Sequence, residues 1–164
     1  MESIRRTRFG VRLLNVVDRG IVIVTAAAYG LFLLSLFFSK SDRLVVSILV
    51  PAISFLILTL IRSRINAPRP YEVFGFDPVI SKNTVGQSFP SRHVFSIFCI
   101  ATVMGMVDKS LAMPMILLGV LLAILRVLGG VHFVKDVVVG AVSGVLFAMI
   151  GMWLSSFIPV VGAA

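Results

Sequence analysis

Two histidines and one aspartate stand in short polar strings near several arginines, in a chain that is otherwise strongly apolar. His93 ends a Pro-Ser-Arg-His string that begins at Pro90, and His132 lies four residues before Asp136. Guanidinium groups present planar forks of donors that match phosphate oxygens, and an imidazole can act as a nucleophile or as an acid and base. These residue types therefore indicate a site that binds a phosphate and cleaves it from its ester.

The spacing of His132 and Asp136 places both side chains on one face of a helix, or of the turn that leads into it. A carboxylate that holds one ring nitrogen fixes the tautomer and leaves the other nitrogen to attack. His93 is then the expected proton donor to the departing oxygen. Either histidine alone is equally well explained as a hydrogen-bonded contact between membrane helices, but the two together favour catalysis.

Three arginines lie at or near the ends of apolar segments, where a cation inside hydrocarbon costs about 2.5–3.5 kcal/mol. Snorkelling to lipid head groups explains a single such arginine, and we assign it to Arg19 and Arg64. Gathered cations repel one another unless an anion or water separates them. Since Asp136 is the only acid in these strings, three arginines are expected to bind an anionic ligand: Arg62, Arg69 and Arg126.

The composition predicts a membrane protein. Of 164 residues, 59% are hydrophobic and 13% charged, and the mean hydropathy is +1.08, whereas soluble domains are about half apolar and about a quarter charged. The net charge of +8 indicates anionic head groups and topology signals, and no interleaving of aromatic and basic residues supports nucleic-acid binding. Cys99 is the only cysteine, which excludes an internal disulfide and a zinc site built on it. No metal or other cofactor is expected.

Five apolar segments predict an all-α, polytopic bundle of about five transmembrane helices, judged against the roughly 20 residues that a helix needs to cross hydrocarbon. They are residues 21–38, 44–61, 91–107, 111–128 and 137–158. The third is short and begins near His93, which suits a helix whose start lines a polar cavity. Pro51 and Pro114 are expected to kink their helices. Residues 21–164 should form a single catalytic domain.

The first twenty residues differ, because a helix there would carry apolar residues on one face and arginines on another. We expect residues 1–20 to form an interfacial amphipathic arm in the head-group plane; a disordered basic leader that only sets orientation is the alternative. A cleavable signal peptide is not expected, because the apolar stretch continues past Ala26 to Ala28.

Residues 61–91 form a long polar connection rich in proline and glycine. Loops of that length in compact proteins are usually functional or disordered, and the arginines and histidine that bracket this one favour function. Three of its aromatic residues are candidates for guiding an acyl or prenyl chain, although aromatic residues are common at membrane boundaries without that role: Phe74, Phe76 and Phe89.

Three strings resemble, in order and spacing, the signature of the type 2 phosphatidic acid phosphatase (PAP2) superfamily: Arg62-x6-Arg69-Pro70, Pro90-Ser91-Arg92-His93 and Arg126-x5-His132-x3-Asp136. The resemblance implies that His132 attacks phosphorus to form a phosphohistidine, that Asp136 orients it, and that His93 protonates the leaving group. It also implies that no metal is needed. The phosphoryl oxygens would be bound by Arg62, Arg69, Arg126, Ser91 and the backbone near Arg92.

The chain departs from that signature at three positions. Arg62 stands where lysine is usual and can bind phosphate as a fork. Arg92 stands where glycine is usual, so its side chain must point away or add a phosphate contact. Leu125 replaces a common serine, which would remove one hydrogen bond. None of the three removes a chemical participant, and we expect activity to be retained.

The resemblance and the site chemistry together predict a metal-independent membrane lipid phosphatase. Its candidate substrates are phosphatidic acid, phosphatidylglycerol phosphate, and polyprenyl phosphates or diphosphates. The alternative is a non-catalytic lipid-phosphate sensor or transporter, which would not need the pair of His132 and Asp136. A haloperoxidase is disfavoured because the chain is mostly membrane-spanning, so vanadate should inhibit. A homo-oligomer is left open, since Gly140 and Gly144 permit close packing within one bundle or between copies.

Five crossings would place the amino terminus, the long connection and the segment before the fifth helix on one side of the cell membrane. That side holds twelve of the fifteen Lys and Arg residues, and the other holds Lys40, Arg43 and Lys109. Without the four candidate ligand arginines the ratio is still eight to three. The positive-inside rule therefore predicts a cytoplasmic catalytic face.

Overall fold

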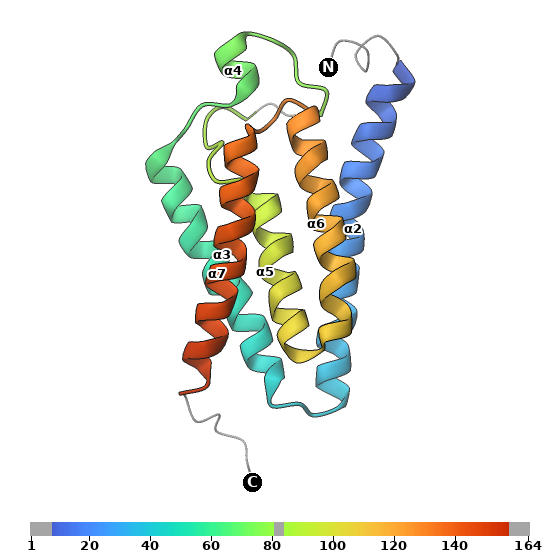
Figure 1. Ribbon diagram of the computed structural model, residues 1–164, viewed down its shortest axis with the longest axis vertical. Helices are drawn as coiled ribbons and strands as arrows, with labels where there is room; N and C mark the ends of the chain where they lie inside the picture. The colour runs from blue at the N-terminus through green and yellow to red at the C-terminus, as the bar shows by residue number, and fades with distance from the viewer. Residues whose placement is uncertain (1–7, 81–83, 158–164) are drawn as a thin grey trace.

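The computed structural model describes residues 8–80 and 84–157, and all regular structure within these ranges is helical (Figure 1). The helices are α2 (Arg8–Phe38), α3 (Arg43–Ile65), α4 (Pro70–Phe74), α5 (Arg92–Val107), α6 (Lys109–Leu128) and α7 (Val134–Ser155). Four of them are long and apolar enough to cross a bilayer, and α5 is a shorter apolar helix of 16 residues. The predicted all-helical membrane bundle is confirmed, and the chain is a multi-pass membrane protein.

The breaks between the long helices follow from local sequence. Lys40, in the turn between α2 and α3, and Asn66, at the end of α3, both have a positive φ, the left-handed conformation that commonly ends a helix. Asp108 separates α5 from α6 and accepts hydrogen bonds from Ser110 N (2.9 Å) and Ser110 Oγ (2.7 Å). These bonds cap α6 and hold the pKa of Asp108 below its usual value. Long helices that follow one another in the chain therefore run in opposite directions (Figure 1).

Helix α5 lies at the centre of the bundle and packs against α2, α3, α6 and α7. Its contact with α7 is close because two glycines face it. A Cβ atom at Gly140 would lie 2.8 Å from Ser91 O, and one at Gly144 would lie 2.5 Å from Phe95 O. This pair therefore packs within the bundle, against the backbone of α5. Pro51 and Pro114, the predicted kink positions, lie inside the continuous helices α3 and α6.

The amino-terminal segment differs from the expected separate arm. Residues 8–20 run without a break into the first apolar segment, so Arg8–Phe38 is one helix. Leu14 is buried in a cluster with Val79, Ile80 and Val131, which fixes this part of α2 against the body. Residues 1–7 lie outside the described residues, and the placement of the segment in the head-group plane stays a prediction.

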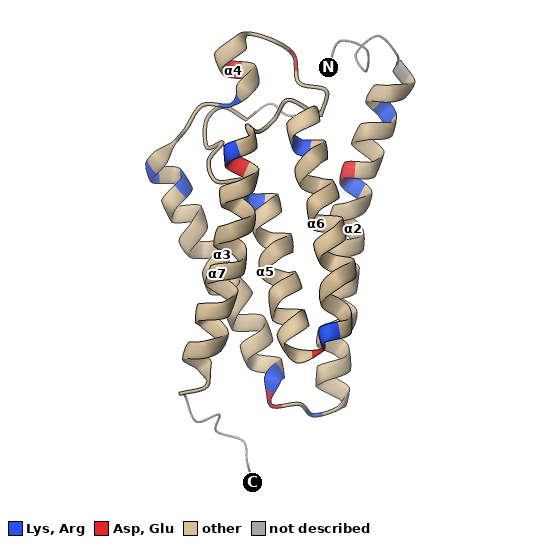
Figure 2. Cartoon of the chain, viewed as in Figure 1, with Lys and Arg blue, Asp and Glu red and all other residues tan. Residues whose placement is uncertain are grey.

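Charged side chains are concentrated at one end of the bundle (Figure 2). That end carries α4, the start of α5 and the loop before α7. Lys40 lies in the turn at the opposite end, where Arg43 and Lys109 begin α3 and α6. The predicted sharing of one side by the basic loops therefore holds in the fold. The cytoplasmic assignment of that side stays a prediction.

Candidate active site

The three polar strings converge on a cavity of about 270 Å³ at the charged end of the bundle. Its wall combines the end of α3, the long connection, the start of α5 and the loop before α7. The predicted site residues that line it are Arg62, Arg69, Arg92, His93 and His132, joined by loop residues Thr84, Val85, Gly86 and Gln87. Parts of the chain that are distant in sequence are thus brought together around one space.

His132 lies in the loop before α7 and is 2% exposed. Its Nδ1 atom is 3.5 Å from Asp136 Oδ2 and 3.4 Å from Ser88 Oγ, so the ring is oriented from that side. Burial lowers the pKa of His132 to about 4; the hydrogen bond that the ring donates to Asp136 opposes this shift, and the positive charge of Arg69 adds to it. The imidazole is therefore neutral at pH 7, the state that a nucleophile requires.

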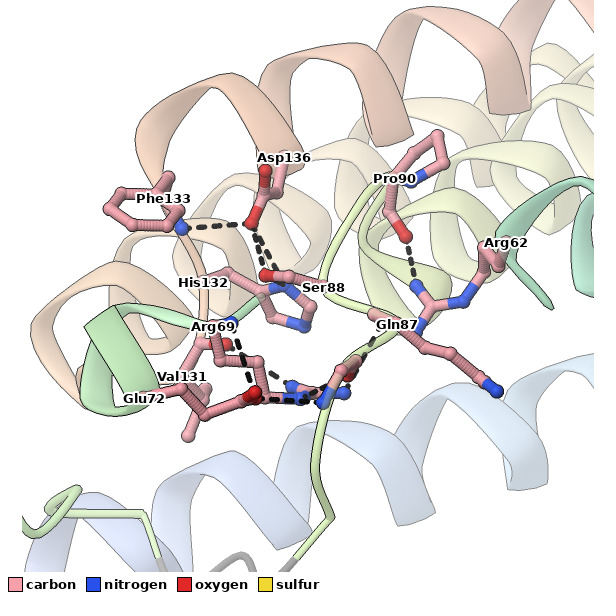
Figure 3. A network of polar contacts seen from close by, with 11 residues as sticks. Arg62, Arg69, Glu72, Gln87, Ser88, Pro90, Val131, His132, Phe133 and Asp136 are labelled. Atoms are coloured by element: carbon pink, nitrogen blue, oxygen red, sulfur yellow. Dashed lines mark hydrogen bonds and ion pairs between the residues drawn. The ribbon is translucent and has the colours of Figure 1, made fainter. Parts of the chain in front are cut away.

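Asp136 is fully buried in the first turn of α7. Its Oδ2 atom accepts a hydrogen bond from Ser88 Oγ at 2.5 Å and from Phe133 N at 3.0 Å, and its main-chain carbonyl accepts one from Ser91 N at 2.8 Å. The contact with Phe133 N also caps the helix, since it satisfies a donor that the helix itself leaves unpaired. Figure 3 shows the carboxylate between Ser88, His132 and Phe133. Two donors thus hold the carboxylate that faces the imidazole, and a third holds the main chain of Asp136.

Ser88 is a residue that the sequence did not single out. It is fully buried and comes from the long connection, 48 residues before Asp136. Its only sequence signal is its position two residues before Pro90, which does not distinguish it from other polar loop residues. Its contact with the carboxylate depends on the folded path of that loop.

Arg62 and Arg69 are buried at 5% and 2% exposure. Arg62 donates to the main-chain carbonyls of Pro90 and Gln87, and Arg69 donates to those of Gly86 (2.9 Å), Val131 (3.2 Å) and Gln87 (3.4 Å) (Figure 3). A guanidinium has five N–H donors. These contacts use two donors of Arg62 and three of Arg69, so both cations keep donors for an anion in the cavity that they line.

Glu72 of α4 holds the loop that faces these arginines. Its Oε1 atom accepts hydrogen bonds from Arg69 N at 3.2 Å and from Gly86 N at 2.8 Å. Gly86 has a φ of +68°, which side chains rarely permit, and a Cβ atom there would also lie 2.4 Å from Asn66 Oδ1, so that the Asn66 side chain would have to move. The cavity wall therefore depends on a glycine at this position.

Arg92 and His93 lie at the start of α5, where the cavity opens toward the interior of the bundle. Arg92 is exposed, and its guanidinium carbon lies 5.5 Å from the centre of the Phe55 ring, a cation–π contact. The side chain that replaces the usual glycine thus points along the cavity wall. Ser91, by contrast, is fully buried and is not among the lining residues, so its contact with phosphate stays a prediction.

Arg126 also differs from the expectation, because it is not among the residues that line the cavity. It is buried at the end of α6 and pairs with Asp18 of α2: Nε lies 2.8 Å from Oδ1, and Nη2 donates to Oδ2 at 3.0 Å. Asp136 is therefore not the only acid close to these arginines. Asp18 lies outside the strings that carry the chemistry, and no spacing in the sequence connects it with Arg126.

An apolar path leads away from the polar cavity. A second cavity, of about 330 Å³, shares Arg92 and His93 with it, and a third, of about 320 Å³, shares Phe55 and Ser96 with the second. The second and third are lined mainly by apolar side chains of α2, α3 and α5. The aromatic residues expected to guide a lipid chain do not line this path: Phe74, Phe76 and Phe89.

Comparison with known proteins adds family and fold. A sequence model described as "PAP2 superfamily" matches residues 43–158. The bacitracin transport permease protein BcrC of Bacillus licheniformis is 31% identical over 86 residues, which are 51% of this chain and 42% of that relative. The match thus spans less than half the length of this curated relative.

Two solved structures have the same fold. The crystal structure of Aquifex aeolicus LpxE superposes with a TM-score of 0.70 and 24% identity, covering 87% of this chain and 92% of that one. The crystal structure of the first transmembrane PAP2 type phosphatidylglycerolphosphate phosphatase from Bacillus subtilis gives a TM-score of 0.72 and 24% identity, covering 89% and 78%. The bundle described above is therefore the fold of membrane PAP2 phosphatases.

Proposed function

The chain belongs to the PAP2 superfamily, and from this premise we propose that it is a metal-independent phosphatase that hydrolyses a lipid phosphomonoester or diphosphate through a phosphohistidine. The observation that carries the proposal is a buried, neutral imidazole beside a fixed carboxylate, at the wall of a cavity lined by Arg62 and Arg69. Binding alone would need the arginines but not the imidazole and carboxylate.

In the first step, the substrate phosphate lies among the arginines, and Nε2 of His132 attacks phosphorus. A P–N bond forms as the P–O bond to the lipid breaks, and His93 gives its proton to the departing oxygen. Asp136, held by Ser88, stabilises the positive charge that develops on the ring. In the second step, water loses a proton to His93 and attacks phosphorus, which breaks the P–N bond, releases phosphate and restores His132.

The arrangement supplies the kind of help that this reaction needs. Uncatalysed hydrolysis of phosphate monoesters is so slow that enzymes accelerate it by up to about 10²¹-fold. A covalent step divides the reaction into two easier displacements, and cations already held in place stabilise the charge of the transition state without reorganisation. The carbonyls of the long connection provide this preorganisation for Arg62 and Arg69.

The apolar path supports a lipid as the leaving group. It begins at His93, the proposed acid, and continues beside α5 between α2 and α3. A leaving oxygen next to His93 would therefore continue into a chain that lies among apolar side chains. Arg92 also lies where the polar cavity meets the apolar path. A lipid diphosphate would place its second phosphate there, whereas phosphatidic acid would place its neutral glycerol there. Among the candidate substrates, a lipid diphosphate thus gains one further charged contact.

The test is phosphate release from a panel of lipid phosphates by detergent-purified protein in EDTA. The panel contains phosphatidic acid, phosphatidylglycerol phosphate, and polyprenyl monophosphate and diphosphate. We expect release without added metal, inhibition by orthovanadate, and no turnover in His132→Ala. Lys135→Ala, an exposed change three residues further along, should keep wild-type rates.

A second variant distinguishes the proposed role of His93, the acid, from that of His132, the nucleophile. His93→Ala should recover part of its activity on a phosphate ester with an acidic leaving group, such as a nitrophenyl ester, because that group departs without a proton donor. It should also accumulate a base-stable phosphoenzyme, since activation of water is impaired. Phosphate release retained in His132→Ala would refute the nucleophile, and binding of lipid phosphates with no release by the wild type would identify a sensor or transporter instead.

A further inference from the structure

A carboxylate from α2 reaches the third polar string, although α2 precedes the residues that match the family. Asp18 and Arg126 are each 4% exposed, and the two atom pairs between them, at 2.8 and 3.0 Å, form a bidentate contact. A guanidinium held in this way has both its position and its plane fixed. The contact uses the Nε and Nη2 atoms of the guanidinium.

This pair adjoins the loop that carries the nucleophile. The carbonyl of Arg126 accepts a hydrogen bond from Val131 N at 3.2 Å, and the carbonyl of Val131 accepts one from Nη1 of Arg69 at 3.2 Å. Val131 therefore joins the buried arginine of α6 to an arginine of the cavity wall. His132 is the next residue in the chain, so the position of Arg126 and that of the nucleophile are linked through one residue.

The turns of α2 that precede Asp18 are also fixed against this region. Asn15 Nδ2 donates to the carbonyl of Val79 at 2.8 Å, and Leu14 is buried with Val79 and Val131. Asp18 thus projects from a part of α2 that is tied to the long connection and to the loop before α7. These contacts restrain the backbone of α2 one turn before Asp18, so the position of its carboxylate is restrained as well.

We propose that Asp18 is a positioning residue for the phosphatase reaction, which holds Arg126 and, through the hydrogen bond from Val131 N to the carbonyl of Arg126, the loop that places His132 for attack. The proposal rests on the proposed function and extends it to a helix outside the three motifs. An asparagine at this position would offer one neutral acceptor in place of a carboxylate. The guanidinium would then lose its second anchor and its counter-charge, while keeping its own charge.

The first experiment compares Asp18→Asn with Arg19→Gln, an exposed change at the next residue of the same helix. Misplacement of a catalytic group by about 1 Å costs up to about 10²-fold in rate. We therefore expect a 10- to 100-fold lower kcat for Asp18→Asn, a KM within about threefold of wild type, and weaker inhibition by orthovanadate. Asp18→Glu, which keeps the charge, should retain more activity than Asp18→Asn. Wild-type kcat and vanadate inhibition in folded Asp18→Asn would overturn the proposal.

A double-mutant cycle tests whether Asp18 acts through Arg126. If it does, Asp18→Asn should cause no further loss of kcat in an Arg126→Gln background. A purely structural role, independent of the arginine, would give losses that multiply, and that result would also overturn the proposal. If Asp18→Asn does not fold, Arg126→Lys replaces it, because lysine keeps the charge but cannot form the bidentate contact; wild-type kcat in that variant would contradict the proposal.

The same proteins separate this proposal from the proposed function. Phosphate release that is abolished in His132→Ala but unchanged in Asp18→Asn would refute the positioning role alone. If wild-type protein releases no phosphate, the role of Asp18 can still be tested by the increase in melting temperature that orthovanadate causes. Loss of that increase in Asp18→Asn but not in Arg19→Gln would support the role of Asp18 in anion binding, and an equal increase in both would end it.

Discussion

The contact between α5 and α7 can be tested by adding one methyl group. In Gly144→Ala, the new Cβ atom would lie 2.5 Å from Phe95 O, 3.1 Å from Cys99 N and 3.2 Å from Phe98 Cβ, whereas ordinary contact begins at 3.4 Å. The two nearest atoms belong to the backbone of a helix and cannot yield as a flexible side chain would. The two helices must therefore separate locally by about 0.9 Å.

That separation acts directly on the site, because the two histidines lie at the starts of these helices. His93 is in the first turn of α5, His132 is in the loop just before α7, and Asp136 is in the first turn of α7, where its carbonyl accepts a hydrogen bond from Ser91 N. A shift of about 1 Å between reacting groups costs up to about 10²-fold in rate, and overpacking costs about 1–3 kcal/mol in stability. We expect a 10- to 100-fold lower kcat and a lower melting temperature in detergent.

The assay is phosphate release at saturating substrate, with melting temperature measured on the same preparations. Gly30→Ala is the matched control: it is also a glycine inside a membrane helix, and an added Cβ atom meets nothing within 4 Å. Its kcat should stay within about twofold of wild type. Gly140→Ala, with the new atom 2.8 Å from Ser91 O, should also reduce kcat. Wild-type kcat and melting temperature in Gly144→Ala would refute the idea that backbone contact between the helices sets the geometry.

Three further predictions follow from individual side chains. Ser88→Ala removes the 2.5 Å donor to the buried Asp136 carboxylate, and it should cost about 1–3 kcal/mol in stability and about 10-fold in kcat, whereas the exposed Ser63→Ala should change neither. Arg92→Gly should lower kcat/KM about 10-fold for a lipid diphosphate, the loss of one charged contact, and leave phosphatidic acid unchanged; equal losses on both would contradict the second-phosphate contact. Because burial lowers the pKa of His132 from 6.5 to about 4, the unfolded chain takes up a proton below pH 6.5 that the folded protein does not. Stability should therefore fall by up to about 3 kcal/mol between pH 6.5 and 4, and denaturant titrations of His132→Gln should lack that component.

Much of the fold was predictable because apolar runs report helices directly. Each of the five predicted segments has a counterpart among the helices α2, α3, α5, α6 and α7, and the spacing of His132 and Asp136 placed their side chains within 3.5 Å of each other. Such local patterns depend on one stretch of chain at a time. They therefore describe a helix and its faces without identifying its neighbours.

The rest depended on which elements meet in space. Ser88 and Asp18 contact partners 48 and 108 residues away, and no periodicity connects residues at such separations. The segment around Asp18 showed an amphipathic pattern, which predicted a surface arm. In the structure, Leu14 of this segment is buried against the body, whereas three residues of its apolar face stay exposed: Phe9, Leu13 and Val16.

The length of α5 has a consequence for where the reaction takes place. Sixteen residues at about 1.5 Å each span about 24 Å, less than the roughly 30 Å of hydrocarbon in a bilayer. The helix begins deeper in the bundle than α6 and α7 reach at the same end (Figure 1), so the short span falls at the end that carries Arg92 and His93. To be cleaved, a lipid would have to move its phosphate from the membrane surface into the polar cavity, while its hydrocarbon chain remained in the leaflet. Only water and the released phosphate would cross the protein surface, and the dephosphorylated lipid would diffuse away sideways without entering the aqueous phase.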